Sequence, residues 1–201
     1  MKLLFLDFET YYDREYSLRK MTPPEYILDS RFEVICCAVA EGTEPSRVID
    51  GPEFGAWLSQ YDPDDTATVT FNALFDNAIL AWRYGFVPKQ IYDTMAMARA
   101  LYGHEIEQSN LRYLLKHFNS PWAKGTAIEN MIGVHRADLE HRLLQKRDFW
   151  NYANIDNEGN RWLYAKLRKE LPDSEAKLMN LVLRARDPAV QGQRAHARTA
   201  P

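Results

Sequence analysis

Two carboxylates stand near the start of the chain, at Asp7 and Glu9 within the largely apolar segment Lys2–Thr10 (KLLFLDFET). This segment predicts a strand, and side chains alternate between the two faces of a strand, so Asp7 and Glu9 should point the same way. Two ionised carboxylates on one face repel each other and lose hydration unless a cation joins them. The spacing therefore indicates a divalent-metal site. The alternative is an acidic pair that is simply solvated at a strand end.

A third carboxylate, Asp76, lies just after the strand predicted at 66–71. Asn72 is placed to cap the helix that follows at 74–84. Asp76 then falls in the first turns of that helix, where the helix dipole favours an anion. The position is consistent with a metal ligand and also with a residue that only complements the dipole.

The last polar group, Tyr152 and Asp156, lies far along the chain in a long amphipathic pattern. Residues four apart share one face of a helix and are about 6 Å apart along its axis. Gly159 falls on the same face, where a missing side chain permits close approach of a strand or a substrate. The alternative interpretation of this face is ordinary helix surface.

Together the three segments resemble the motifs of the DEDD (DnaQ-like) 3′–5′ exonucleases, in the branch with a tyrosine in the last motif. The residues that fit the three motifs are Asp7 and Glu9, then Asn72, Phe75 and Asp76, then Tyr152 and Asp156. Over residues 1–180 the chain is similar to the proofreading domains of phage and bacterial family A DNA polymerases. Order and spacing of the motifs both agree with this resemblance.

The resemblance implies hydrolysis by a two-metal-ion mechanism, with two Mg²⁺ or Mn²⁺ ions that activate water and stabilise the leaving oxygen. The implied metal ligands are Asp7, Glu9, Asp76 and Asp156, and oxygen-only ligands suit these hard ions. Tyr152 is implied to orient the attacking water. An ordinary tyrosine pKa of about 10 makes it a poor general base, so positioning is the expected role.

Three further residues are expected to contact the substrate: Thr10, Asn72 and Phe75. Phe75 either stacks near the terminal base or packs in the core, and Asn72 either bonds the substrate backbone or caps its helix. The segment 11–29 carries several tyrosine, arginine and lysine side chains. It is either a loop that guides the strand or a packed surface loop.

By resemblance, the substrate is the 3′ end of single-stranded DNA, cleaved in proofreading during DNA replication beside a DNA polymerase. RNA is an alternative substrate, and the 2′-hydroxyl contact that would distinguish the two is not visible in the sequence. A non-catalytic module that docks onto a polymerase is the alternative class. The expected location is the cytoplasm of a bacterium or of a phage-infected host cell.

Composition agrees with a globular protein, because 46% of the 201 residues are hydrophobic and 12% are aromatic. The net charge of −3 argues against tight, sequence-specific duplex binding, which needs a basic stripe. No apolar run approaches the roughly 18 residues that span a bilayer, so no membrane partner is expected.

Hydrophobic periodicity predicts alternating strands and helices. The expected strands are 2–8, 32–41, 46–50 and 66–71, and the expected helices are 52–60, 74–84, 94–102, 111–118, 137–147 and 149–171. Order and resemblance predict an α/β, ribonuclease-H-like fold, a mixed five-stranded sheet flanked by helices. One exonuclease domain is expected over 1–187, followed by a flexible tail at 188–201.

Overall fold

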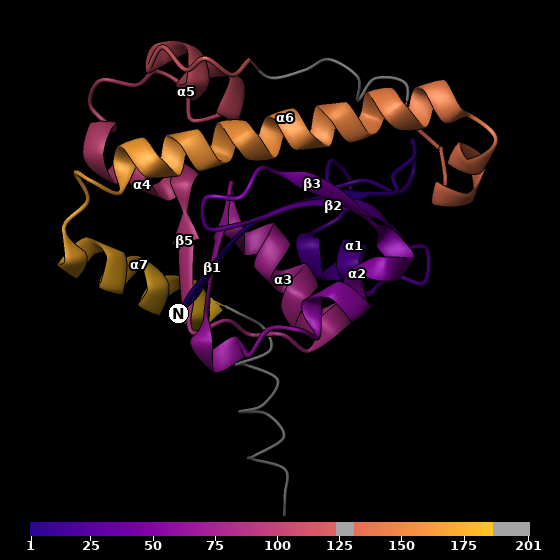
Figure 1. Cartoon of the computed structure of the whole chain (residues 1–201), viewed down its shortest axis with the longest axis horizontal. Coiled ribbons are helices and arrows are strands. Elements are labelled where there is room, and N and C mark those ends of the chain that lie inside the picture. Colours follow the sequence, from indigo (N-terminus) through magenta and orange to yellow (C-terminus); the bar gives the residue numbers. More distant parts are fainter. Residues whose placement is uncertain (124–130, 187–201) are drawn as a thin grey trace, which may run out of the picture.

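The computed structural model describes residues 1–123 and 131–186, so the tail predicted at 188–201 lies outside the described residues. Its centre is a five-stranded mixed sheet in the order β3-β2-β1-β4-β5 (Figure 1). The strands are β1 (Lys2–Thr10), β2 (Val34–Glu41), β3 (Arg47–Asp50), β4 (Thr66–Thr70) and β5 (Gln90–Asp93). β2 pairs antiparallel with β1 and with β3, whereas β1, β4 and β5 are parallel. The predicted mixed five-stranded sheet is confirmed.

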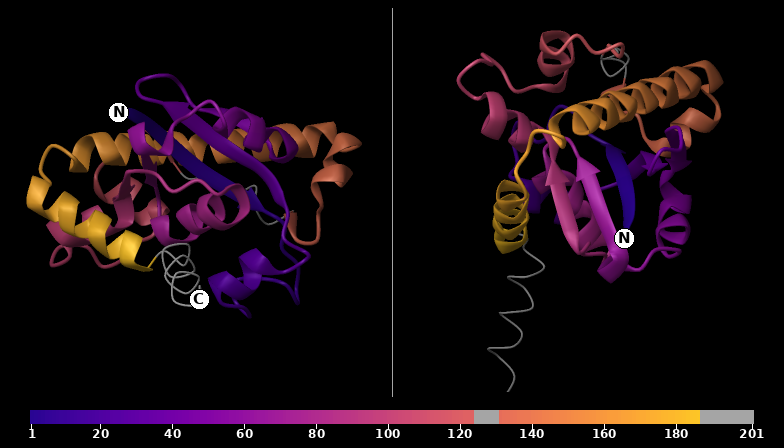
Figure 2. Two further views of the ribbon diagram at one scale, coloured as in Figure 1. Left: turned by 90° about the horizontal axis from the view of Figure 1, so that it is seen from below. Right: turned by 60° about the vertical axis from the view of Figure 1, so that its left-hand side comes forward.

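Helices cover both faces of this sheet. They are α1 (Pro23–Leu28), α2 (Gly51–Leu58), α3 (Ala73–Tyr84), α4 (Thr94–Tyr102), α5 (Leu111–His117), α6 (Leu143–Leu167) and α7 (Asp173–Arg186). α6 runs across one face and contacts four strands, while α2 and α3 pack on the other face (Figure 1). Figure 2 shows α7 beside β5 at the edge of the sheet. None of the described helices is both long and apolar enough to cross a membrane.

The alternation predicted for β1 separates two layers of core. Leu4, Leu6 and Phe8 lie in the cluster that includes residues of α2, α3 and the first half of α6. Phe5 lies in the other cluster, with residues of α4, α5 and the second half of α6. Because Asp7 and Glu9 alternate with the first set, both carboxylates share the face of β1 that carries Phe5.

Two predicted features of the second half of the chain are wrong. The helix expected at 137–147 is a short 3-10 helix at Arg136–Glu140, and α6 then runs unbroken from Leu143 through the break expected at 148. Arg136 donates two hydrogen bonds of 2.6 Å to Asp50 at the end of β3. This long-range pair ties the 3-10 segment to the sheet, and no proline or glycine marks the true break.

Three other elements are absent from the sequence prediction: α1, β5 and α7. α1 and β5 have only six and four residues, too few to show a clear period. α7 follows Pro172, and the helix before it, expected to reach 171, ends at Leu167. The end predicted for α3 is confirmed, since Gly85 closes it with a left-handed φ of 64°.

Candidate active site

The carboxyl end of β1 carries the first two acidic side chains into an opening of the sheet. Asp7 lies opposite Ala38 and Glu9 opposite Cys36 on β2, but pairing with β4 on the other side ends at Phe5. The last residues of β1 therefore have a strand neighbour on one side only. Ligand sites of open α/β sheets form at such carboxyl ends.

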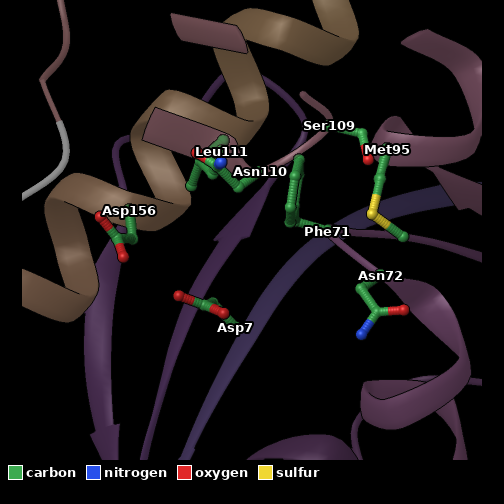
Figure 3. Close-up of a pocket in the computed structure, with 8 residues that line it drawn as sticks. All are labelled: Asp7, Phe71, Asn72, Met95, Ser109, Asn110, Leu111 and Asp156. Carbon is green, nitrogen blue, oxygen red and sulfur yellow. The ribbon is translucent and has the colours of Figure 1, made fainter. Parts of the chain in front are cut away.

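α6 brings Asp156 to the same place. Asp7 and Asp156 line one cavity of about 430 Å³, and Figure 3 shows both carboxylates pointing into it. The other lining residues are Phe71, Asn72, Met95, Ser109, Asn110 and Leu111. The fold thus joins the first and last predicted motifs, which stand near opposite ends of the chain.

Tyr152 lies one helical turn before Asp156 and is 4% exposed. Burial raises its pKa most, and the charge of Glu9 and the nearby Asp156 carboxylate raise it further. The phenol therefore stays protonated at neutral pH and can act as a donor. This agrees with a positioning role and not with a general base.

Asp76 is buried under β1, and its carboxylate accepts a hydrogen bond of 3.3 Å from the backbone N–H of Phe8. Burial raises the pKa of Asp76, and the negative charge of Asp7 raises it further. Asp76 is thus an electrostatic neighbour of Asp7, although it does not line the cavity that Asp7 and Asp156 share.

Asn72 has a left-handed backbone (φ 66°, ψ 61°), and its side chain makes no helix-capping hydrogen bond. The prediction that it caps α3 is wrong. Asp93 at the end of β5 accepts the backbone N–H groups of Asn72 and Ala73 instead, at 3.1 and 3.0 Å. The Asn72 side chain is left at the cavity wall, where it can meet a ligand (Figure 3).

A second cavity, of about 640 Å³, opens beside the first. Glu9, Thr10 and Phe75 line it, so it gathers one predicted metal ligand and two predicted substrate contacts. The Thr10 hydroxyl is also hydrogen-bonded to the Tyr26 hydroxyl at 2.8 Å. The Phe75 ring lies 6.0 Å from the Tyr26 ring, so it packs against the core and still faces the cavity.

The carboxylates do not form a complete ligand shell as they stand. Within residues 1–123 and 131–186, no three His, Cys, Asp or Glu side chains converge closely enough to hold a metal ion. Their chemistry nevertheless fits a hard divalent ion, because oxygen donors alone face the cavity from β1 and α6. A bound cation would also relieve the repulsion between these carboxylates.

The sequence interpretation did not place α4 and α5 at the site. Met95 at the start of α4, and Ser109, Asn110 and Leu111 at the start of α5, complete the first cavity. The sequence predicts Asp93 as the cap of the helix at 94–102 and Ser109 or Asn110 as the cap of the helix at 111–118. The structure confirms Asp93, which accepts from Met95 and Ala96, and selects Asn110, which accepts from Tyr113. Capping is a local signal, and it does not show that both helix starts face one cavity.

Gly159, expected on the face of Tyr152 and Asp156, is buried against α5. A Cβ atom at this position would meet Cδ1 of Leu115 at 2.8 Å. The missing side chain therefore admits a neighbouring helix and not the strand or substrate that was considered.

No protein-family model matches the chain, and no curated protein matches it. Solved structures do match in fold. Brucella melitensis NrnC with bound Mg²⁺ has 17% sequence identity and a TM-score of 0.58, covering 99% of this chain and 88% of that one. A structure described as the apo form of the nuclease has 17% identity and a TM-score of 0.62, covering 99% and 87%. Brucella melitensis NrnC bound to pGG has 15% identity and a TM-score of 0.54, covering 99% and 88%. The predicted ribonuclease-H-like fold is confirmed.

Proposed function

We propose that this protein is a metal-dependent 3′–5′ exonuclease that hydrolyses phosphodiester bonds at the 3′ ends of single-stranded DNA. The observation that carries the proposal is the meeting of Asp7 and Asp156 at one cavity, with Tyr152 one helical turn from Asp156. The structural neighbours support it, since one is called a nuclease, one holds Mg²⁺ and one holds pGG. A polymerase-docking module would have no need of these intact carboxylates.

In this proposal Asp7, Glu9, Asp76 and Asp156 hold two Mg²⁺ or Mn²⁺ ions. Bound divalent ions supply an acidified water and stabilisation of the leaving 3′-oxygen. The protonated Tyr152 hydroxyl near Asp156 aligns the attacking water at that carboxylate. Because its pKa is raised, Tyr152 removes no proton.

In this proposal the residues that contact the substrate are those that line the two cavities. Asn72 reaches the strand from the first cavity, while Thr10 and Phe75 meet it in the second, where the Phe75 ring offers a base a stacking surface. We assign the exonuclease to a single domain over 1–187, working in proofreading beside a DNA polymerase.

The direct test is cleavage of 5′-labelled single-stranded DNA, and of its RNA counterpart, with Mg²⁺, with Mn²⁺ and with EDTA. We expect a ladder that shortens from the 3′ end, requires the metal and is stronger for DNA. A stronger RNA ladder would make the enzyme an exoribonuclease. Absence of cleavage of either strand by folded, metal-supplemented protein would reject the exonuclease proposal.

Tyr152→Phe should lower kcat by about 10- to 100-fold, because it removes the hydroxyl that aligns the attacking water beside a metal-binding carboxylate. The increase in melting temperature on addition of Mg²⁺ should persist, since all four carboxylates remain. Tyr164→Phe, on the same helix and outside both cavities, is the matched control. Steady-state kinetics and thermal unfolding measure the two effects, and full activity of Tyr152→Phe would remove the hydroxyl from the mechanism.

A further inference from the structure

The segment between β1 and β2 is rigidly packed on its inner side. Tyr16 is fully buried, its ring stacks 4.4 Å from that of Tyr26, and its hydroxyl donates to the Tyr26 carbonyl at 2.6 Å. Asp13 accepts hydrogen bonds from the backbone N–H groups of Glu15 and Tyr16, at 2.7 and 2.6 Å. The packed-loop interpretation of residues 11–29 is therefore confirmed for this inner side.

The outer side of the same segment borders the second cavity. Arg14, Arg19 and Lys20 are exposed and line it, so three cations stand on the rim of a cavity whose lining also includes the two carboxylates of Glu9 and Asp13. Within the described residues, neither Arg14 nor Arg19 forms an ion pair. Lys20 is paired with Glu15 at 2.8 Å, but both side chains are at least half exposed, and such a pair contributes little.

The rim and the wall of this cavity differ in chemistry. The partly exposed rings of Tyr12 and Phe75 line the cavity, while the exposed cations stand at its mouth. Aromatic faces that stack bases, next to cations that follow the backbone, are the combination used by proteins that bind single strands. The chain as a whole carries a net charge of −3, so this local group of cations is not part of a general basic surface.

We propose that Arg14, Arg19 and Lys20 bind non-scissile phosphates of the single strand, upstream of the bond that is cut. The inference rests on the proposed function, because it takes the carboxylates as the position of the scissile phosphate. A released nucleotide carries only that one phosphate, whereas three cations match a strand with several. The packed tyrosines Tyr16 and Tyr26 fix the backbone of the segment that carries these cations, which reduces the backbone entropy lost when the strand binds.

The test compares R14A/R19A/K20A with R47A/K169A/K177A, which removes three exposed cations that line neither cavity. Binding of a fluorescent single-stranded oligonucleotide is measured by anisotropy in EDTA at several salt concentrations. Each phosphate contact contributes about 0.7 to the slope of the logarithm of the association constant against the logarithm of salt concentration. The slope for R14A/R19A/K20A, the rim variant, should therefore be smaller in magnitude by about 2. The affinity of this variant should fall by at least about tenfold at low salt, while the control variant stays near the wild type.

A second substrate distinguishes a loss of strand binding at the rim from a loss of catalysis at the carboxylates. Thymidine 5′-(p-nitrophenyl phosphate) has one phosphodiester and no upstream phosphate, and its hydrolysis by water releases p-nitrophenolate and the 5′-nucleotide. The rim variant should cleave it at the wild-type rate while losing kcat/KM on the oligonucleotide through KM.

An unchanged salt slope, or an equal loss on both substrates, would overturn the assignment of the rim. If the wild type cleaves neither substrate but the rim variant still loses oligonucleotide affinity, the exonuclease proposal fails and the strand-binding site stands.

Discussion

Asp7→Asn should lower the rate of strand cleavage by about 10³-fold or more and, in metal-free buffer, raise the melting temperature. A metal ion supplies several kcal/mol of transition-state stabilisation, and each 1.36 kcal/mol corresponds to a factor of ten in rate. Loss of the Asp7 ligand, which faces the same cavity as Asp156 of α6, should remove most of that stabilisation. Stability should rise because the charge of Asp7 disfavours ionisation of the buried Asp76 carboxyl.

The increase in melting temperature on addition of metal is a third measurement for Asp7→Asn, beside the cleavage rate and the metal-free melting temperature. Ions that bind only the folded state stabilise it by about 2.7 kcal/mol at a concentration 100 times Kd. The wild-type melting temperature should therefore rise with Mg²⁺ or Mn²⁺, and that rise should shrink in Asp7→Asn. Asp148→Asn, an exposed position on the same helix as Asp156, is the control with an equal change of charge. A melting temperature of Asp7→Asn below the wild-type value in EDTA would mean that Asp7 is structural.

Asp93→Ala should lower the free energy of unfolding by about 3–5 kcal/mol, because each buried N–H group left without an acceptor costs about 1–3 kcal/mol. The Asp93 carboxylate is 4% exposed and accepts four backbone N–H groups at 3.0–3.2 Å, from Asn72, Ala73, Met95 and Ala96. It joins the starts of α3 and α4 to the end of β5. Such a loss is a large part of the roughly 5–15 kcal/mol that stabilises a typical domain.

Asp93→Asn tests the hydrogen bonds while a side chain of nearly the same size and shape is retained. Its amide oxygen can take the place of Oδ1 and keep three of the four bonds, leaving only Ala73 without its acceptor. We expect a cost of about 1–2 kcal/mol for this variant. Urea unfolding with an unchanged m-value measures both changes. A loss below about 1 kcal/mol for Asp93→Ala would show that the four contacts are dispensable.

Tyr11–Asp29 shows why a sequence interpretation of a loop stays open. Its aromatic and basic residues were visible, but the side on which each would lie was not. In the structure, Tyr16 and Tyr26 turn inward and stack, while Arg14, Arg19 and Lys20 face the cavity that contains Glu9. The segment includes the short helix α1, which carries Tyr26 and which the sequence prediction missed. The rest of it has no fixed side-chain period, so only the packed structure shows which residues are buried.

Local patterns in the sequence were enough to predict the shared face of Asp7 and Glu9, the end of α3 at Gly85, the caps Asp93 and Asn110, and the shared helix face of Tyr152 and Asp156. These depend on strand and helix periods and on hydrogen bonds between near neighbours. The metal and substrate roles of these residues remain predictions.

The contacts between distant segments became visible only in the folded structure. In the structure, β5 lies at the edge of the sheet and Arg136 is hydrogen-bonded to Asp50. The backbone N–H of Asn72 donates a hydrogen bond to Asp93, and Asp7 and Asp156 line one cavity. Each of these requires strands or helices far apart in the chain to dock. Docking is determined by packing of the whole core, which no local pattern of residues reports.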